Sequence, residues 1–133
     1  MEDNMPAAKA TKEELASRFA QYSKYENQFK KAIDAASGGC VKRHIFLPSG
    51  RYIYTVVGRN GDEFVDPDRP YCSCESYFFG VLSSKVKYCY HILSYKIAEA
   101  SELVQEIRFD DEEYDIFMRL LVLDIMQSKE GQK

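Results

Sequence analysis

The sequence lacks several features that would place a protein in a familiar functional class. It has no tryptophan, and it has only two histidines and four prolines in 133 residues. It contains no glycine-rich phosphate-binding pattern, no internal repeat and no low-complexity tract. No apolar run approaches the roughly 20 residues that a membrane-spanning helix requires. No basic segment followed by an apolar one opens the chain, so we expect an intracellular protein.

The composition is that of one folded domain. Hydrophobic residues make up 45% of the chain and aromatic residues 14%. The net charge of −3 argues against general nucleic-acid binding, but the charge is uneven: residues 40–100 carry +2 and residues 101–133 carry −5. We favour a solvated surface of mixed sign. The alternative is a small basic patch for DNA, formed by Arg51, Arg59, Lys85 and Lys87.

Three of the four cysteines and one of the two histidines gather in 20 residues. They are Cys72, Cys74, Cys89 and His91. Thiolate sulfur and imidazole nitrogen are the donors of tetrahedral Zn²⁺ sites, and three cysteines with one histidine complete the coordination shell. The pattern therefore predicts one structural zinc ion. Because no coordination position is left for a substrate, we expect a protein that is not an enzyme.

The spacing of these residues also predicts local structure. Cys72 and Cys74 point to the same side if their segment is extended. Cys89 is expected just before a helix that runs from about residue 90 toward Leu103 or Ile107, with His91 in or near its first turn. The partial positive charge of that helix N-terminus would stabilise nearby thiolates.

Other interpretations of the cysteines and histidines remain open. A disulfide between Cys72 and Cys74 would be strained, and a disulfide framework needs a secretory setting. The four residues could also be unrelated core residues, since free cysteine is often buried. His44 is an alternative ligand, although a half-buried strand histidine is the favoured interpretation. Cys40 is interpreted as a small buried or edge residue.

The chain divides into four predicted segments. Residues 1–10 show no periodicity and are expected to be a flexible N-terminus. Residues 11–39 predict one N-terminal helix, which begins with a capping box of Thr11 and Glu14. Residues 40–108 predict the zinc domain, with strands at 41–47, 51–58 and 63–65 and helices at 75–83 and from about 90. Residues 109–133 predict a C-terminal helix. The fold class is α+β: a small antiparallel β-sheet plus a CxC…CxH zinc knuckle, flanked by N- and C-terminal helices.

The C-terminal helix, regular over 111–128 after a break at 108–110, is unusually apolar. Its acidic start at 110–113 suits a helix N-terminus, the alternative being a DNA mimic. One of its two apolar stripes consists of Ile116, Leu120 and Leu123. A surface helix needs only one such stripe. The helix is therefore either fully buried or shared with another chain, and we favour sharing.

The CxC…CxH pattern is that of the SWIM-type zinc finger. Further residues extend the match: Ser49-Gly50-Arg51, Ile53-Tyr54, Val56, Gly58, Tyr71, Phe79, Val81-Leu82 and Leu93. Over about residues 45–100, the chain resembles the SWIM-domain subunits of the Shu complex. Glu75 stands where the family often has proline. Tyr90 stands where it often has a basic residue, which weakens a phosphate-binding role for this loop.

The resemblance implies a function. It implies a non-catalytic zinc-binding subunit in the nucleus, with residues 40–108 as the SWIM-type zinc domain. Its partner would be a RecA-like recombinase paralogue, and the pair would promote assembly of recombinase filaments on single-stranded DNA in homologous recombination repair. The alternative hypothesis is a stand-alone nucleic-acid-binding zinc module that uses the basic patch and exposed tyrosines.

Overall fold

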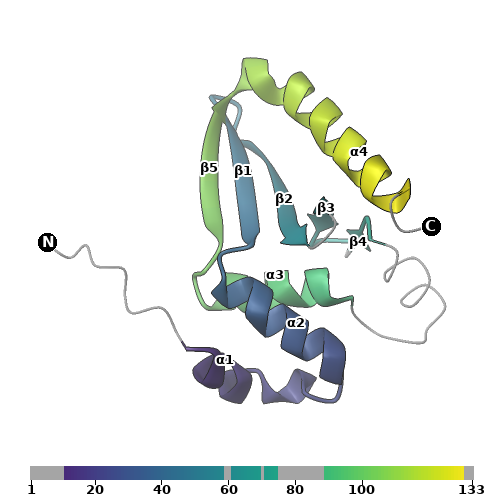
Figure 1. Cartoon of the computed structure of the whole chain (residues 1–133). Helices are drawn as coiled ribbons and strands as arrows, with labels where there is room; N and C mark the ends of the chain where they lie inside the picture. Colours follow the sequence, from purple (N-terminus) through teal and green to yellow (C-terminus); the bar gives the residue numbers. More distant parts are fainter. Residues whose placement is uncertain (1–10, 59–60, 70, 75–88, 131–133) are drawn as a thin grey trace, which may run out of the picture.

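A mixed five-stranded sheet forms the centre of the protein, with helices on both of its faces (Figure 1). The computed structural model describes residues 11–58, 61–69, 71–74 and 89–130. The strands are β1 (Val41–Leu47), β2 (Arg51–Gly58), β3 (Gly61–Asp66), β4 (Tyr71–Cys72) and β5 (Gln105–Asp110). Their order across the sheet is β4-β3-β2-β1-β5. Neighbours from β1 to β4 are antiparallel, while β1 and β5 are parallel.

Successive side chains of a strand point to opposite faces, and both faces of this sheet are covered. We call one the metal face; its buried members are Val41, Tyr54, Val56, Val65 and Cys72. It packs against α1 (Lys12–Arg18), α2 (Glu26–Ser37) and α3 (Tyr90–Ala100). We call the other the α4 face; its central members are His44, Phe46, Thr55 and Phe109. It packs against α4 (Tyr114–Glu130).

The N-terminal segment is two helices, so the prediction of one helix over 11–39 is wrong. The capping box is confirmed, because Thr11 and Glu14 bond each other's backbone N–H. The short 3-10 helix η1 (Ala20–Tyr22) then separates α1 from α2. Glu26, which interrupts the apolar stripe of a single helix, is instead the first residue of α2, where a carboxylate is favourable.

The prediction that α3 continues to Leu103 or Ile107 and that 108–110 is a break is also wrong. The helix ends at Ala100, and Glu102 adopts a positive φ of 58°. The chain then turns into β5, which places Phe109 beside Phe46 of β1. The sheet is therefore larger than predicted and has one parallel pair. The predicted α+β class, with flanking helices and the CxC…CxH cluster, is confirmed.

The C-terminal helix begins as its acidic residues predict. Asp110 and Glu113 form a capping box, and the 3-10 helix η3 (Asp111–Glu113) leads directly into α4. Phe117 of α4 then packs on Phe46 with ring centroids 5.4 Å apart. In the described residues, no helix has the length and apolar character to cross a membrane. The predicted flexible N-terminus and the predicted helix at 75–83 lie outside the described residues.

Candidate metal centre

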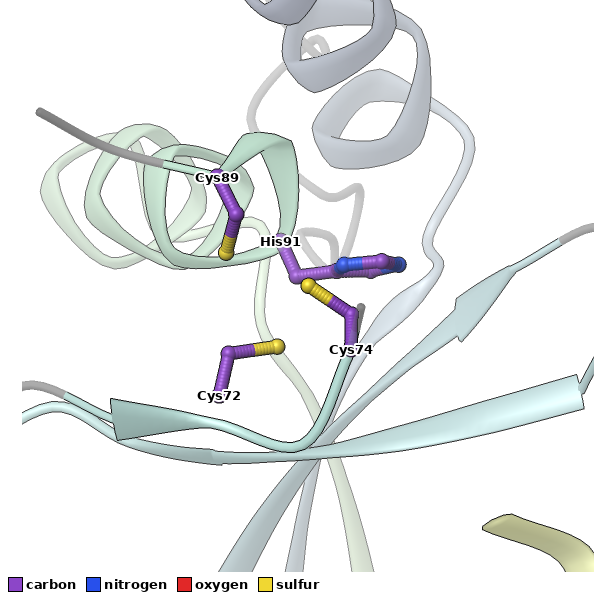
Figure 2. Close-up of side chains that lie close together, drawn as sticks. All are labelled: Cys72, Cys74, Cys89 and His91. Carbon is purple, nitrogen blue, oxygen red and sulfur yellow. The ribbon is translucent and has the colours of Figure 1, made fainter. Parts of the chain in front are cut away.

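Two short segments bring the four predicted ligands to one point between the sheet and α3. Cys72 ends β4 and Cys74 lies two residues later, so both point to the same side. Cys89 is the extended N-cap of α3, and His91 is the second residue of that helix. Figure 2 shows the three sulfur atoms and the imidazole ring facing one another across the gap between strand and helix.

The cluster is compact and closed to solvent. One donor atom from each of the four residues lies within 4.8 Å of all the others. None of the four side chains is more than 6% exposed. Three thiolates at such distances would repel one another strongly unless a cation lay among them. The arrangement therefore suits a metal ion held by four protein atoms.

The imidazole of His91 has a buried nitrogen that supports this interpretation. Among the residues that the structure describes, no group forms a hydrogen bond with its Nδ1 atom. An unpaired buried nitrogen costs free energy, so native structures rarely retain one. Figure 2 shows the ring beside the sulfur of Cys74, which is where a shared metal ion would lie. Coordination of a metal by Nδ1 would satisfy the atom.

The thiols differ in their tendency to lose a proton. Hydrogen bonds from the thiols of Cys72 and Cys89 lower the pKa of Cys74. Hydrogen bonding to Cys74 and Cys89, together with burial, raises the pKa of Cys72. A metal ion that replaces the shared protons would ionise all three cysteines.

Sequence reasoning missed the groups that position the CxC segment. The backbone N–H of Ser73 donates to the carbonyl of Phe64 at 3.0 Å, and the N–H of Phe64 donates to the Ser73 hydroxyl at 2.9 Å. That hydroxyl in turn donates to buried Glu63 at 2.7 Å. The segment is thereby held to β3 beyond the end of β4. A serine between the two cysteines was the available signal.

Glycine and tyrosine residues surround the other nitrogen of His91. A Cβ atom at Gly58 would lie 3.3 Å from Nε2 of His91 and 3.3 Å from the carbonyl oxygen of Gly61. The ring of Tyr90 lies over the imidazole, with centroids 3.9 Å apart. Only a residue without a side chain leaves the imidazole this room. Gly58 is one of the residues that carry the resemblance, and its close approach to the imidazole of His91 explains why glycine suits this position.

His44 and Cys40 are not part of the cluster. His44 lies on the α4 face, where its Nε2 atom is 2.9 Å from the Thr55 hydroxyl and its ring packs on Phe117. Burial, and secondarily the charge of Lys42, lowers its pKa to about 4. The interpretation of His44 as a strand histidine is confirmed, but the residue is buried, with 6% exposure, and not half-buried as predicted. Cys40 is partly buried beside α2 and outside the metal-ligand group.

Arg51, the one member of the predicted basic patch that lies in the described residues, has contacts within the protein. Its guanidinium lies 4.0 Å from the centre of the Tyr114 ring and 3.7 Å from a carboxylate oxygen of Asp111. It also donates to the Ser49 hydroxyl at 3.2 Å. The contacts indicate that Arg51 ties the β1–β2 turn to the start of α4. Arg59, Lys85 and Lys87 lie outside the described residues.

The residues predicted to bind a partner lie on the outer side of α4. Ile116, Leu120 and Leu123 are 62%, 61% and 52% exposed. No described segment of the chain therefore covers this apolar stripe. Met126, three residues after Leu123, extends the stripe, and the exposed side chain of Val122 lies beside it on the side of the sheet; the sequence analysis singled out neither residue.

Comparison with known proteins gives one relevant similarity. The chain is 42% identical over 78 residues to a protein of Dictyostelium discoideum described as "Zinc finger SWIM domain-containing protein 7 homolog". The match covers 56% of this chain and 49% of the relative, so the chain spans about half of that protein's length. No family profile and no solved structure matches the chain. The predicted resemblance is confirmed by this similarity and the four clustered residues.

Proposed function

Starting from a chain that carries a SWIM-type zinc finger motif, we propose that it is a non-catalytic, zinc-stabilised subunit of a protein complex. One structural Zn²⁺ is held by Cys72, Cys74, Cys89 and His91. The observation that carries the proposal is the buried group of four donors within 4.8 Å. Soft thiolate and imidazole donors in a tetrahedral set favour zinc.

The donor set also favours a structural role over a catalytic one. Catalytic zinc is bound by three protein ligands and keeps one position for water or substrate. Here the protein supplies all four donors, and each of their side chains is buried. When bound, the ion holds β4 against the start of α3. The residues around it exclude water and orient the ligands.

For the partner, we propose a RecA-like recombinase paralogue. The pair would act in the nucleus and promote assembly of recombinase filaments on single-stranded DNA in homologous recombination repair. The support is the resemblance over about residues 45–100, which includes the Ser49-Gly50-Arg51 turn. The uncovered apolar stripe on α4 supports a role that depends on contact with another protein.

Co-expression with RecA-like recombinase paralogues of the same cell tests the proposal. The wild-type chain should co-purify with one of them as a stoichiometric complex that contains zinc. Cys72→Ser should lose both zinc and the paralogue, whereas Cys40→Ser should keep both, because Cys40 lies outside the cluster. The purified pair should then speed filament assembly on single-stranded DNA in a fluorescence assay.

Two results would contradict the proposal. The first is a stable zinc-loaded monomer that co-purifies with none of these ATPases. The second is a chain that binds single-stranded DNA alone, with an affinity that falls steeply as salt rises. The second result would favour the stand-alone nucleic-acid-binding module.

A further inference from the structure

We propose that the outer side of α4 and the groove beside it form a docking surface for a basic amphipathic helix of the partner protein. We define this docking surface by its exposed apolar residues, which are Ile116, Leu120, Val122, Leu123 and Met126. The inference rests on the proposed function and deepens it, since it places the partner on one part of the molecule and specifies its chemistry.

The docking surface is apolar and continuous along the helix. Its five members are between 47% and 62% exposed. Ile116, Leu120 and Leu123 are spaced by four and three residues, so they form one stripe on a helix. Large apolar side chains gathered on one exposed stripe mark a surface that another molecule covers. An amphipathic helix laid along α4 would bury this stripe.

A groove beside residues 118–126 of α4 extends the docking surface onto the sheet. It has a volume of about 230 Å³ and lies between the inner edge of α4 and strands β3 and β4. Phe64 and Tyr71 form its wall on the sheet, and Leu121 forms its wall on the helix. Val122 and Met126 line the groove and are also exposed members of the docking surface. The groove has room for a large apolar side chain of the partner.

The groove and the metal centre share one segment of chain. Cys72 and Cys74 point to the metal centre, while Tyr71 and Ser73, which alternate with them, line the groove. A metal ion that fixes the two cysteines therefore also fixes the groove wall. We expect docking to depend on bound zinc even though the partner does not touch the ion.

Hydrogen bonds anchor α4 to the sheet without the help of a partner. Near its start, the carboxylate of Asp111 accepts hydrogen bonds from the backbone N–H of Ser49 at 3.0 Å and its hydroxyl at 2.7 Å. Toward its other end, Asp124 accepts from the backbone N–H of Asp62 at 2.6 Å. A helix held just before its start and again in its second half loses less conformational entropy on binding, which raises affinity.

The charge around the docking surface selects the partner. Residues 111–130, which form η3 and α4, carry six acidic and two basic side chains. Glu112, Glu113 and Asp115 are exposed at the start of α4, and Arg119 offsets only part of their charge. Two copies of this chain would bring like charges together, which disfavours self-association. A partner helix with a stripe of leucine or similar apolar residues would complement the apolar docking surface. Lysine or arginine residues on either side of that stripe would complement the acidic residues around it.

A designed peptide tests the surface with the zinc-loaded full chain. The probe is an 18-residue amphipathic peptide with one leucine stripe flanked by lysines, and its twin has glutamates in their place. By fluorescence anisotropy, the lysine peptide should bind at least about tenfold tighter than its twin. Leu120→Asp should weaken binding by about tenfold or more. Tyr52→Asp is the matched control, because Tyr52 is 51% exposed on the metal face, and it should leave binding within about twofold.

Several outcomes would overturn the inference. Equal binding of the two peptides, no binding of either, or full binding by Leu120→Asp would each do so. A wild-type dimer in sedimentation that Leu120→Asp dissociates would assign the surface to a second copy. A melting temperature of Leu120→Asp far below that of Tyr52→Asp would show that another part of this chain covers the stripe.

The same variants separate this inference from the proposed function. If the co-expressed ATPase binds wild type and Leu120→Asp equally well, the proposed function stands and the docking surface is wrong. If no RecA-like ATPase co-purifies but the lysine peptide binds as expected, the docking surface stands and the proposed partner is wrong. Loss of the ATPase in Leu120→Asp alone, with zinc content unchanged, supports both.

Discussion

The two faces of the sheet are stabilised in different ways. On the metal face, four donors from residues 72–74 and 89–91 meet in a buried cluster, with α1, α2 and α3 packed around it. On the α4 face, one helix is held by the aromatic rings of Phe46, Phe109 and Phe117 and by two carboxylates, Asp111 just before its start and Asp124 in its second half. The first face combines a packed apolar core with a buried group of four metal donors, whereas the second depends on packing and polar contacts alone.

The difference separates two tasks within one small domain. A metal ion bound by the four donors would add a large stabilising free energy to the apolar core that this face already holds. The α4 face spreads a smaller free energy over many contacts, and its helix keeps an apolar outer side for other molecules. In the proposed function, the metal face therefore supplies most of the stability and the α4 face supplies the surface for recognition.

Removal of a metal ligand should have the largest effect and should destroy both faces. Structural zinc in small modules contributes on the order of 10–16 kcal/mol, which exceeds the total stability of most domains. We expect Cys72→Ser and His91→Ala to be unfolded or insoluble, as measured by circular dichroism and thermal melting. Cys40→Ser should melt like the wild type. A Cys72→Ser protein that melts like Cys40→Ser would contradict the account.

Removal of a buried ring should damage the α4 face alone. Phe46 is fully buried between the sheet and α4, and Phe46→Ala should lower the free energy of unfolding by about 3–5 kcal/mol in urea titrations. Tyr52→Ala, at an exposed site, should cost about 1 kcal/mol or less. The folded Phe46→Ala protein should keep its zinc. Loss of zinc from the folded variant would show that the two faces are not separate.

Acid should weaken the α4 face through His44. Its pKa is about 4 in the folded chain and 6.5 when unperturbed, so the unfolded chain takes up the proton first as the pH falls. The stability that neutral His44 contributes is full above pH 6.5 and is lost between 6.5 and 4, in total about 3 kcal/mol.

The measurement is the free energy of unfolding against pH in wild type and His44→Gln. Acid also releases zinc from both proteins, so the difference between their curves isolates His44. We expect the wild type to lose more stability over this window. Parallel curves would contradict the assigned role of His44.

Substitutions of Gly58 and Gly61, which flank the β2–β3 turn, should each affect one face of the sheet, with smaller effects than the loss of a metal ligand or of a buried ring. In Gly58→Ala, the new Cβ would press on His91 Nε2, so zinc affinity should fall about tenfold in chelator competition. In Gly61→Ala, the new Cβ would lie 2.8 Å from Asp124 Oδ2 at a backbone φ of +129°, so stability should fall by about 1–3 kcal/mol while zinc affinity is retained. Equal effects of both variants on zinc would contradict the division.

Loss of the Arg51 side chain should have the smallest effect. Its contacts with Asp111 and Tyr114 are exposed, so Arg51→Gln should lower stability by about 0.5–1 kcal/mol, and by less at high salt. Urea titrations at two salt concentrations measure this. Unchanged stability with weakened binding of single-stranded DNA would instead return Arg51 to the predicted basic patch.

The metal centre could be predicted because its ligands occupy two short segments. The i,i+2 spacing of Cys72 and Cys74 suits an extended segment, and apolar residues after Cys89 indicate a helix that begins there. The capping box of Thr11 and Glu14 is equally local. In each case the sequence pattern contains both interacting groups, so no knowledge of tertiary structure is needed.

The α4 face could not be predicted because its contacts join distant segments. Nothing local to residues 105–110 states that they pair with β1, since a short alternating segment becomes a strand only when a neighbour is present. The sequence pattern around Arg51 does not show its contact with Asp111, because the two residues lie 60 positions apart in the chain. The break between α1 and α2 likewise depends on tertiary structure, because apolar residues of both helices pack into the same core.

The most direct test of the account is the metal content of the purified, folded chain. Elemental analysis by mass spectrometry after removal of loosely bound ions should find one zinc per chain in the wild type and in Cys40→Ser. A folded wild-type protein that holds no transition metal, or that holds zinc equally well after Cys72→Ser, would contradict the central claim that these four residues form a structural metal centre.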